Sequence, residues 1–160
     1  MKRDKNLHPF SWEHHHGLVI AKRLQTGLEK QANPEVMSDY ALAMWEEHLK
    51  PHFQHEEVYL VPVMEKYAPN GHSPLIDRLR QEHAEIRQLV QRIQANPNRG
   101  SLLECFAESL VKHIRFEERE LFPYAEQIIP ETEMAEMGRL LHDHYAERCI
   151  DWEPEFWNRD

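Results

Sequence analysis

The sequence repeats itself, and this repeat is the strongest constraint on its fold. Along residues 7–24, positions spaced by three and four are apolar or His, and the same pattern returns 69 residues later along 76–93. The first stripe is Leu7, Phe10, His14, Gly17, Ala21 and Leu24, and the second is Ile76, Leu79, His83, Ile86, Val90 and Ile93. Such spacing places the side chains on one face of a helix. Each stripe therefore predicts an amphipathic helix with a histidine in its buried face.

A second pair of segments repeats with an offset of 61 residues. Segments 52–65 and 113–126 are identical at six of fourteen positions. These positions are His52/His113, Glu56/Glu117, Glu57/Glu118, Leu60/Leu121, Pro62/Pro123 and Glu65/Glu126. The order of the four segments is that of a duplicated helical hairpin. A duplicated hairpin predicts an all-α, up-down-up-down four-helix bundle.

Proline, glycine and capping residues divide the chain into five predicted helices. Their expected bounds are about 11–31, 35–67, 73–95, 101–129 and 131–149. No alternating β-branched run of strand length is present. We expect a single domain over residues 1–160, with a core bundle at about 8–129 and a C-terminal helix and aromatic tail at about 131–160.

Particular residues mark the expected helix ends and irregularities. Ser11 is a predicted N-cap, and Ser101 with Glu104 three residues later predicts a capping box. Pro51 and Pro62 lie inside the second helix. Because proline lacks the N–H that the helix needs, we expect kinks or a break at both.

The composition narrows the classes of function. Acidic residues outnumber basic ones by 28 to 19, and a net charge of -9 argues against nucleic acid or an anionic membrane as the partner. No apolar stretch is long enough to span a bilayer, and no apolar core follows the basic N-terminus as a secretory signal requires. Cys105 and Cys149 are expected to be isolated thiols, and we expect a cytoplasmic location.

Histidine and glutamate pairs repeat on the predicted helices. A His-X-X-X-Glu spacing places both side chains on one helix face, one turn apart, and it occurs in each half of the chain. The two histidines of the apolar stripes face the same interior. Buried polar groups are costly unless they are paired or bind metal. The predicted metal ligands are His14, His52, Glu56, His83, His113 and Glu117.

Carboxylates and imidazoles together suit iron, manganese or zinc. Their number favours two ions, because a single zinc needs only three or four ligands and would leave the others unused. Each ion would take two histidines, for example His14 with His52, and the two glutamates would bridge the ions. An oxide or hydroxide would add a further bridge and leave a position open for a small molecule.

The pattern His…His-X-X-X-Glu…His…His-X-X-X-Glu, with Leu and Pro after each glutamate, resembles the hemerythrin HHE cation-binding family over roughly 8–129. This resemblance implies a four-helix bundle with a non-heme, oxo- or hydroxo-bridged di-iron site that Glu56 and Glu117 bridge. The chain departs from the oxygen carriers of that family. Arg87 stands four residues after His83 where they have a histidine, and they have a longer His-to-Asp spacing on the fourth helix. The sequence is therefore more similar to the non-respiratory members, which include iron–sulfur repair proteins and iron-sensing domains.

Two histidine assignments have alternatives. His15 and His16 adjoin His14, and either is an alternative first ligand if the alignment of the repeats is in error. His48 lies one turn before His52 and is interpreted either as a donor to the site or as an extra ligand.

Other residues near the site have two interpretations each. Glu57 and Glu118 either orient the ligand imidazoles or face solvent. Tyr59 either lines the open metal position or packs in the core. The C-terminal helix and tail either form a contact between two copies or cover one side of the bundle. Surface positions are expected for His8, His72, His142 and His144, and a surface or packing role for His55.

Four classes of function compete. We expect a di-iron protein that binds O2 or NO, or that senses or buffers iron. The alternative is a di-iron enzyme or repair factor that reduces peroxide or NO or donates iron to iron–sulfur clusters. A ferritin-like oxidase is disfavoured because it needs two Glu-X-X-His motifs, and only Glu13 to His16 fits. The fourth class is a metal-free or structural-metal bundle, and another divalent metal could fill the site in a purified sample.

Overall fold

The computed structural model describes residues 2–145 and 150–158. This part of the chain is helical, with no strand among the described residues, and the all-α prediction is confirmed. No helix among these residues is both long and apolar enough to cross a bilayer.

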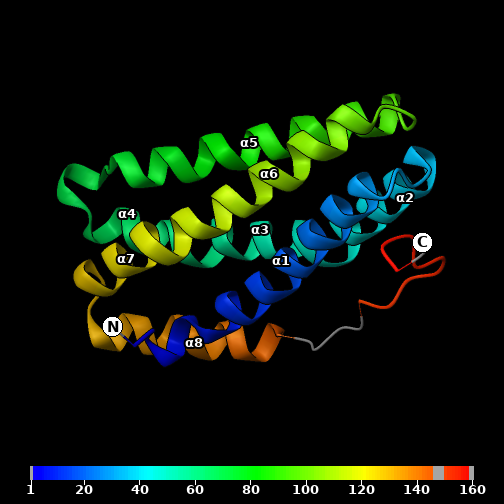
Figure 1. Cartoon of the computed structure of the whole chain (residues 1–160). Coiled ribbons are helices and arrows are strands. Elements are labelled where there is room, and N and C mark those ends of the chain that lie inside the picture. Colours follow the sequence, from blue (N-terminus) through cyan, green and yellow to red (C-terminus); the bar gives the residue numbers. More distant parts are fainter. Residues whose placement is uncertain (1, 146–149, 159–160) are drawn as a thin grey trace.

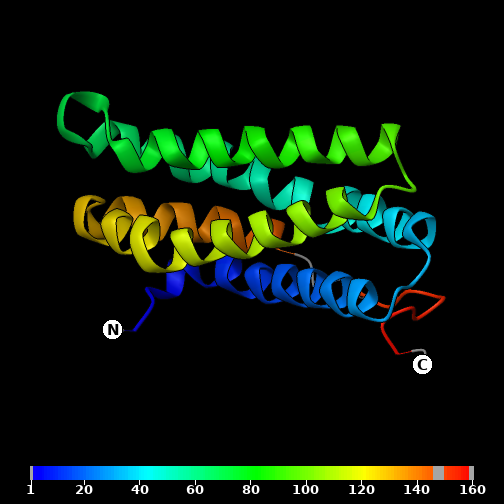
Figure 2. The same cartoon turned by 45° about the horizontal axis from the view of Figure 1, so that its top comes forward.

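Long helical segments lie side by side, and successive segments run in opposite directions (Figures 1 and 2). The first is α1 (His8–Glu29), entered through a 3-10 turn at Lys5–Leu7. The second combines α2 (Pro34–Met44), α3 (Lys50–His55) and α4 (Val61–Tyr67). A 3-10 turn at Pro69–Gly71 leads to the third, α5 (Pro74–Ala95). The remaining helices are α6 (Gly100–Phe116), α7 (Phe122–Ile128) and α8 (Glu131–His144).

Three π-helical turns join the pieces of the second segment and those of α6 and α7. They are η2 (Trp45–Leu49), η3 (Glu56–Leu60) and η5 (Glu117–Leu121). After each turn, a backbone N–H donates to the carbonyl five residues earlier. The three bonds run from Lys50 to Trp45, from Val61 to Glu56 and from Phe122 to Glu117.

Proline explains where these π turns lie. Pro51, Pro62 and Pro123 each follow the last residue of a π turn by two positions. Proline has no N–H to donate, and its ring crowds the carbonyl four residues earlier, so the local bonds shift to the wider spacing. Residues 34–67 remain helical throughout. Of the two predicted alternatives at Pro51 and Pro62, kinks or a break, the break is therefore wrong, because a π turn stands before each proline and the helix continues.

Two predicted helix ends are also wrong. The first helix begins three residues before Ser11, behind a 3-10 turn whose N-cap is Asp4. The capping box of Ser101 and Glu104 does not form, because the N-cap of α6 is Arg99 and makes no side-chain cap hydrogen bond. Local capping patterns were misleading at both places because the helix extends further toward the N-terminus than the pattern requires.

Other boundaries agree with the sequence. The Ser73 side chain caps α5 by accepting from the N–H of Leu75. The fifth helix begins at Glu131 as predicted and ends at His144, because Tyr145 is extended. The rest of that predicted helix, together with Cys149, lies outside the described residues. Cys105 is a free, exposed thiol.

Two apolar clusters fill the interior and leave a polar layer between them. Along α1, Phe10 belongs to one cluster and Leu24 to the other, with His14 between them. Along α5, Leu79 belongs to the same cluster as Phe10 and Ile86 to the same cluster as Leu24, with His83 between them. The duplicated stripes therefore place their histidines at one level of the fold.

α8 and the aromatic tail cover this interior. Met137 and Leu141 of α8 pack in the cluster that contains Phe10. The Phe156 ring is buried with its centroid 5.2 Å from that of Tyr40 on α2. The covering role, one of the two interpretations of the C-terminal region, is thus observed for its described residues.

Candidate metal centre

All six residues singled out in the sequence converge at the polar layer. They form two overlapping groups whose available ligand atoms lie within 4.8 Å of one another. One group is His14, His52, Glu56 and Glu117, and the other is Glu56, His83, His113 and Glu117. All six side chains are buried, and both glutamates belong to both groups.

The Nε2 atoms of the four histidines face the shared glutamates. His14 Nε2 lies 2.9 Å from Glu117 Oε1, and His113 Nε2 lies 3.1 Å from the same oxygen. His52 Nε2 and His83 Nε2 lie 3.2 Å and 3.3 Å from Glu56 Oε1. Four imidazole nitrogens and the carboxylates thus surround a common space.

The neighbouring histidines take other places. His15 is exposed, and His16 lines a separate cavity with His48. His14 is therefore the one of the three consecutive histidines that the fold brings into the cluster. His48 is buried but belongs to neither group of four.

Tyr59 and His55 pack against His144, the last residue of α8. Tyr59 stacks on His144 with ring centroids 5.5 Å apart, which favours packing over a position at the metal cluster. His55 lies beside both rings and is half-buried. His8, predicted at the surface, is also half-buried and lies against Trp12.

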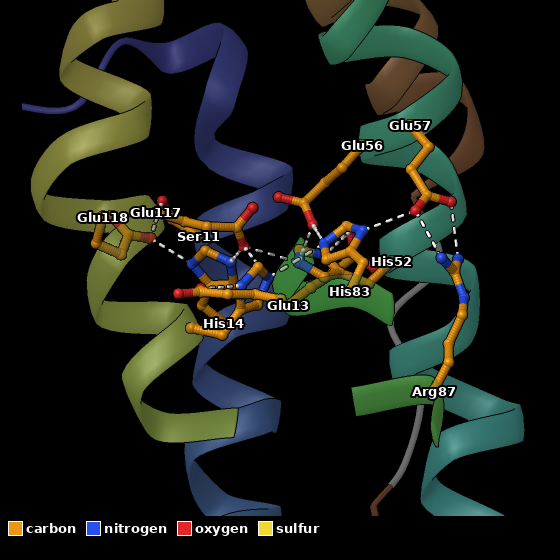
Figure 3. Close-up of polar contacts among 12 residues, drawn as sticks. Ser11, Glu13, His14, His52, Glu56, Glu57, His83, Arg87, Glu117 and Glu118 are labelled. Atoms are coloured by element: carbon orange, nitrogen blue, oxygen red, sulfur yellow. Dashed lines mark hydrogen bonds and ion pairs between the residues drawn. The ribbon is translucent and has the colours of Figure 1, made fainter. Parts of the chain in front are cut away.

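A carboxylate approaches the outer nitrogen, Nδ1, of every histidine in the cluster. Figure 3 shows Glu118 near His14 and Glu57 near His83. The four Nδ1–carboxylate distances are 2.7 Å for His14–Glu118, 2.8 Å for His83–Glu57, 2.9 Å for His113–Glu82 and 3.6 Å for His52–Glu13. An Nδ1–H that donates to a carboxylate leaves the Nε2 lone pair directed inward and fixes the ring. The orienting interpretation of Glu57 and Glu118 is therefore the one that the contacts support.

Glu13 and Glu82 are the functional residues that the sequence argument missed. Each precedes a stripe histidine, but its carboxylate reaches the histidine of a different helix. A signal was present, because these two glutamates repeat at the same 69-residue offset as His14 and His83.

Arginines hold three of the four outer carboxylates. Arg87 donates from both terminal nitrogens to the two oxygens of Glu57, at 2.8 and 2.7 Å (Figure 3). Arg78 donates to Glu82 at 2.8 Å, and Arg3 lies 3.2 Å from Glu118. The bidentate contact of Arg87 fixes the geometry of the Glu57 carboxylate as well as its charge.

The π turn η5 adds to this support. Because the Phe122 N–H donates to Glu117, the carbonyl of Glu118 lacks its usual helical donor. Arg3 donates to that carbonyl as well as to the carboxylate of the same residue. Ser11, which the sequence suggested as a cap, donates its hydroxyl to Glu118 at 2.7 Å.

The electrostatics of the chain alone favour charged pairs. Burial by itself lowers the pKa of His113, but the Glu117 charge and hydrogen bonds to Glu117 and Glu82 outweigh it and raise the pKa to about 10. Burial raises the pKa of Glu117, but the facing His113 holds it well below its ordinary value. For Glu57, His83 and Arg87 overcome burial and lower the pKa to about 2.

The donor set fits a metal cation. Within the described chain, neither carboxylate oxygen of Glu56 and neither ring nitrogen of His52 has a partner in hydrogen-bond geometry, although all are buried. His83 Nε2 and His113 Nε2 face each other at 3.2 Å while their Nδ1 atoms are engaged by carboxylates. Two lone pairs so placed repel each other unless a proton or a cation lies between them. Oxygen and imidazole ligands in this arrangement suit first-row transition metals.

The comparisons with known proteins agree with this geometry. A family model for the hemerythrin HHE cation-binding domain matches residues 11–125. Neither the curated proteins nor the solved structures contained a match. The matched range is most of the chain and includes the whole cluster, so the chain belongs to the hemerythrin HHE cation-binding family.

Proposed function

We propose that this protein binds two iron ions in a hemerythrin-like centre and uses them to bind O2 or NO, or to sense or buffer iron. The observation that carries the proposal is the pair of overlapping four-residue groups that share Glu56 and Glu117. Two groups sharing two carboxylates match two ions with bridging ligands better than they match a single ion. His14 and His52 would hold one ion and His83 and His113 the other.

The residues of the chain prepare such a centre in three ways. The outer carboxylates set the ring tautomers, so that the Nε2 atoms remain available. Burial of all six side chains excludes bulk water. The two shared carboxylates offset part of the charge of the ions. Bound iron would supply a redox-active centre with a coordination position for a small ligand.

The wider assignment belongs to the same proposal. The antiparallel order of the long helical segments supports an up-down-up-down four-helix bundle, forming one domain. Arg87 is paired with Glu57 and supports a non-respiratory member of the family, because it stands where the oxygen carriers have a further histidine. We place the protein in the cytoplasm, with a diatomic molecule or peroxide rather than nucleic acid or membrane as its partner.

Metal content and the visible spectrum test this function together. Protein made in iron-rich medium should contain about two irons per chain, one for each group of four, and show charge-transfer bands of bridged ferric iron. A Glu56→Ala, Glu117→Ala variant should lose the iron and the bands, whereas exposed Glu120→Ala should keep both. Absence of iron in the wild type, even after anaerobic reconstitution, would refute the di-iron assignment.

The small molecule is then identified on the iron-loaded protein. Reversible spectral change with O2 or NO supports a binding role. Turnover of peroxide or NO, or transfer of iron to a cluster-free iron–sulfur protein, would favour the enzyme or repair alternative. The Glu56→Ala, Glu117→Ala variant is the control in each assay, because it lacks both shared carboxylates.

A further inference from the structure

The face of the fold formed by α5, α6 and η5 carries two adjoining cavities. The larger, of about 280 Å³, is lined by residues of all three elements, and the smaller, of about 200 Å³, by residues of α5 and α6. Glu82 and Lys112 line both, so the two cavities form one groove between helices that lie side by side (Figures 1 and 2). The groove is open to solvent, because Lys112, Arg115 and Arg119 along it are exposed.

The internal repeat shows what occupies the equivalent place in the first half of the chain. There, His144 at the end of α8 shares a cavity or a ring contact with five residues, which are Glu13, His16, Pro51, His55 and Tyr59. Their counterparts at offsets of 69 and 61 all line the groove, and they are Glu82, Glu85, Lys112, Phe116 and Glu120. The groove is therefore the place that the end of a helix covers in the other half.

Cations gather in the larger cavity of the groove. It is lined by two carboxylates and by four cations, which are Arg78, Lys112, Arg115 and Arg119. The two carboxylates, of Glu82 and Glu120, both accept from Arg78, at 2.8 and 3.1 Å. Among the described residues, the side chains of the other three cations form no ion pair or hydrogen bond. Three positive charges thus remain unneutralised on a chain whose net charge is -9.

The local fold does not require these three cations. Lys112 precedes Arg115 by three residues, and Arg119 follows Arg115 by four, so the side chains are neighbours on one helix face. Like charges at such spacings destabilise a helix. A binding role explains their presence better than a structural one.

The groove lies directly outside one half of the candidate metal centre. Glu82 lines it, and one oxygen of that carboxylate lies 2.9 Å from Nδ1 of His113 while the other accepts from Arg78. The guanidinium of Arg78 lies 4.1 Å from the centre of the buried Phe116 ring and so covers the apolar side of the cavity. A molecule that contacts Arg78 in the groove therefore stands two contacts away from His113.

We propose that this groove docks an acidic helix of a partner protein. Glu or Asp side chains three and four residues apart on a helix lie one turn apart, as Lys112, Arg115 and Arg119 do, so they face these cations together. Guanidinium groups match carboxylates in shape as well as charge. The repeat favours a helix as the occupant, because the end of α8 fills the equivalent place. The net charge of the chain disfavours a long polyanion such as nucleic acid.

Fluorescence anisotropy with a labelled, helical glutamate–alanine peptide tests the docking. The peptide should bind the wild-type protein at low salt and dissociate as the salt concentration rises. Arg115→Glu, Arg119→Glu should weaken binding at least roughly tenfold, because like charges then face each other across the interface. The matched control is Arg92→Glu, Arg99→Glu, which changes the net charge equally at exposed positions near the other ends of α5 and α6. This control should bind the peptide as the wild type does.

Carbodiimide coupling gives a second measurement that needs no variant, should the double variant fail to fold. The reagent joins carboxylates of the bound peptide to a nearby amine, and mass spectrometry should place the cross-link at Lys112, the lysine that lines the groove. Both measurements apply with and without iron, so they succeed or fail independently of the proposed function.

Four results would overturn the proposal. They are no peptide binding by the wild type, an equal loss in the control variant, cross-links that leave out Lys112, and tighter binding of a labelled oligonucleotide or of pyrophosphate through Arg115 and Arg119. The last result would assign the groove to phosphate groups instead of an acidic helix.

Discussion

The two halves of the duplicated centre have the same inward-facing side chains but differ in the carboxylate and arginine contacts behind them. In the half formed by His83 and His113, both Nδ1 atoms lie within 2.9 Å of a carboxylate, and an arginine holds each carboxylate. In the other half, His14 is supported in the same way through Glu118. The exception is His52, whose Nδ1 lies 3.6 Å from Glu13.

The long contact between His52 and Glu13 has a structural cause. Glu82 is fixed by Arg78, four residues before it on the same helix. No arginine contacts its counterpart Glu13 among the described residues, and Glu13 instead lines the cavity shared with His48. The inward-facing histidines and glutamates therefore agree between the two halves, whereas the charged partners outside them differ.

The comparison separates two kinds of contact. The inward-facing side chains, which would bind the metal, are identical in type in the two halves. Outer carboxylates set ring orientation, and their strength differs from one histidine to the next. We infer that the ion held by His14 and His52 has the more adjustable position and leaves first when metal is removed.

The largest effect should come from a shared ligand. Glu117→Ala should lower the metal content from two ions to none, because Glu117 contacts histidines of both halves at 2.9 and 3.1 Å. Metal analysis of the purified variant measures this, with Glu120→Ala as the exposed control. Retention of one full ion would show that the halves bind independently and would remove the basis for treating them as one centre.

A smaller and unequal effect is expected from the outer carboxylates. Glu82→Gln should weaken binding of its ion by roughly 10- to 100-fold, the usual cost of losing a partner of a metal-bound histidine. Glu13→Gln should cost distinctly less, because its contact with His52 is already long. Competition with a chelator compares the two variants. Equal losses would contradict the asymmetry between the halves.

The pH dependence of the metal-free protein is the third test. His113 has a pKa of about 10 in the folded chain against an ordinary 6.5, so the folded state binds its proton more tightly. The resulting stability is complete below pH 6.5 and is lost as pH rises through about 10. Denaturant unfolding of metal-free protein should therefore show a falling free energy over this window.

Two comparisons separate the titration of His113 from that of other groups. In the His113→Gln variant the fall attributable to this side chain should disappear. In metal-loaded protein the imidazole of His113 is already deprotonated, so raising the pH should not lower the free energy of unfolding through this side chain. For the same reason, metal uptake at neutral pH should release protons. An unchanged pH profile in His113→Gln would show that other groups cause the fall.

The internal repeat explains why the sequence predicted the six clustered residues. An offset of 69 residues aligned His14 with His83, and one of 61 aligned Glu56 with Glu117, so each residue was supported by a second copy. Helical spacing then determined the face. Contacts between helices are different, because a carboxylate such as Glu82 serves His113 of another helix and no spacing within one helix reveals that pairing.

Prolines and caps were predicted less well for a related reason. A proline signals that a regular hydrogen bond is missing, but packing decides whether the helix breaks or widens. Here the helix continues through Pro62, with Leu60, Val61 and Met64 buried beside it. Ser11 has a cap-forming side chain, yet its partner is Glu118, more than a hundred residues away. Local patterns do not contain such contacts.

The smallest expected effect concerns the arginine that replaces the histidine of the oxygen carriers. Arg87 and Glu57 are about a third exposed, at 36% and 31% of their side-chain surface. Exposed ion pairs contribute about 0–1 kcal/mol, which is less than tenfold in affinity. Arg87→Ala should therefore weaken metal binding only slightly, since Glu57 keeps its 2.8 Å contact with His83.

Glu57→Gln makes this last comparison decisive. It removes the charge that fixes His83 and should cost more than Arg87→Ala in the same chelator competition. If Arg87→Ala cost as much, the arginine rather than the carboxylate would fix the ring. The tighter orientation of the His83–His113 half would then depend on a solvent-exposed ion pair. Metal binding by that half should therefore weaken as the salt concentration rises. If the order holds at all salt concentrations, the carboxylates set the difference between the halves and the arginines only refine it.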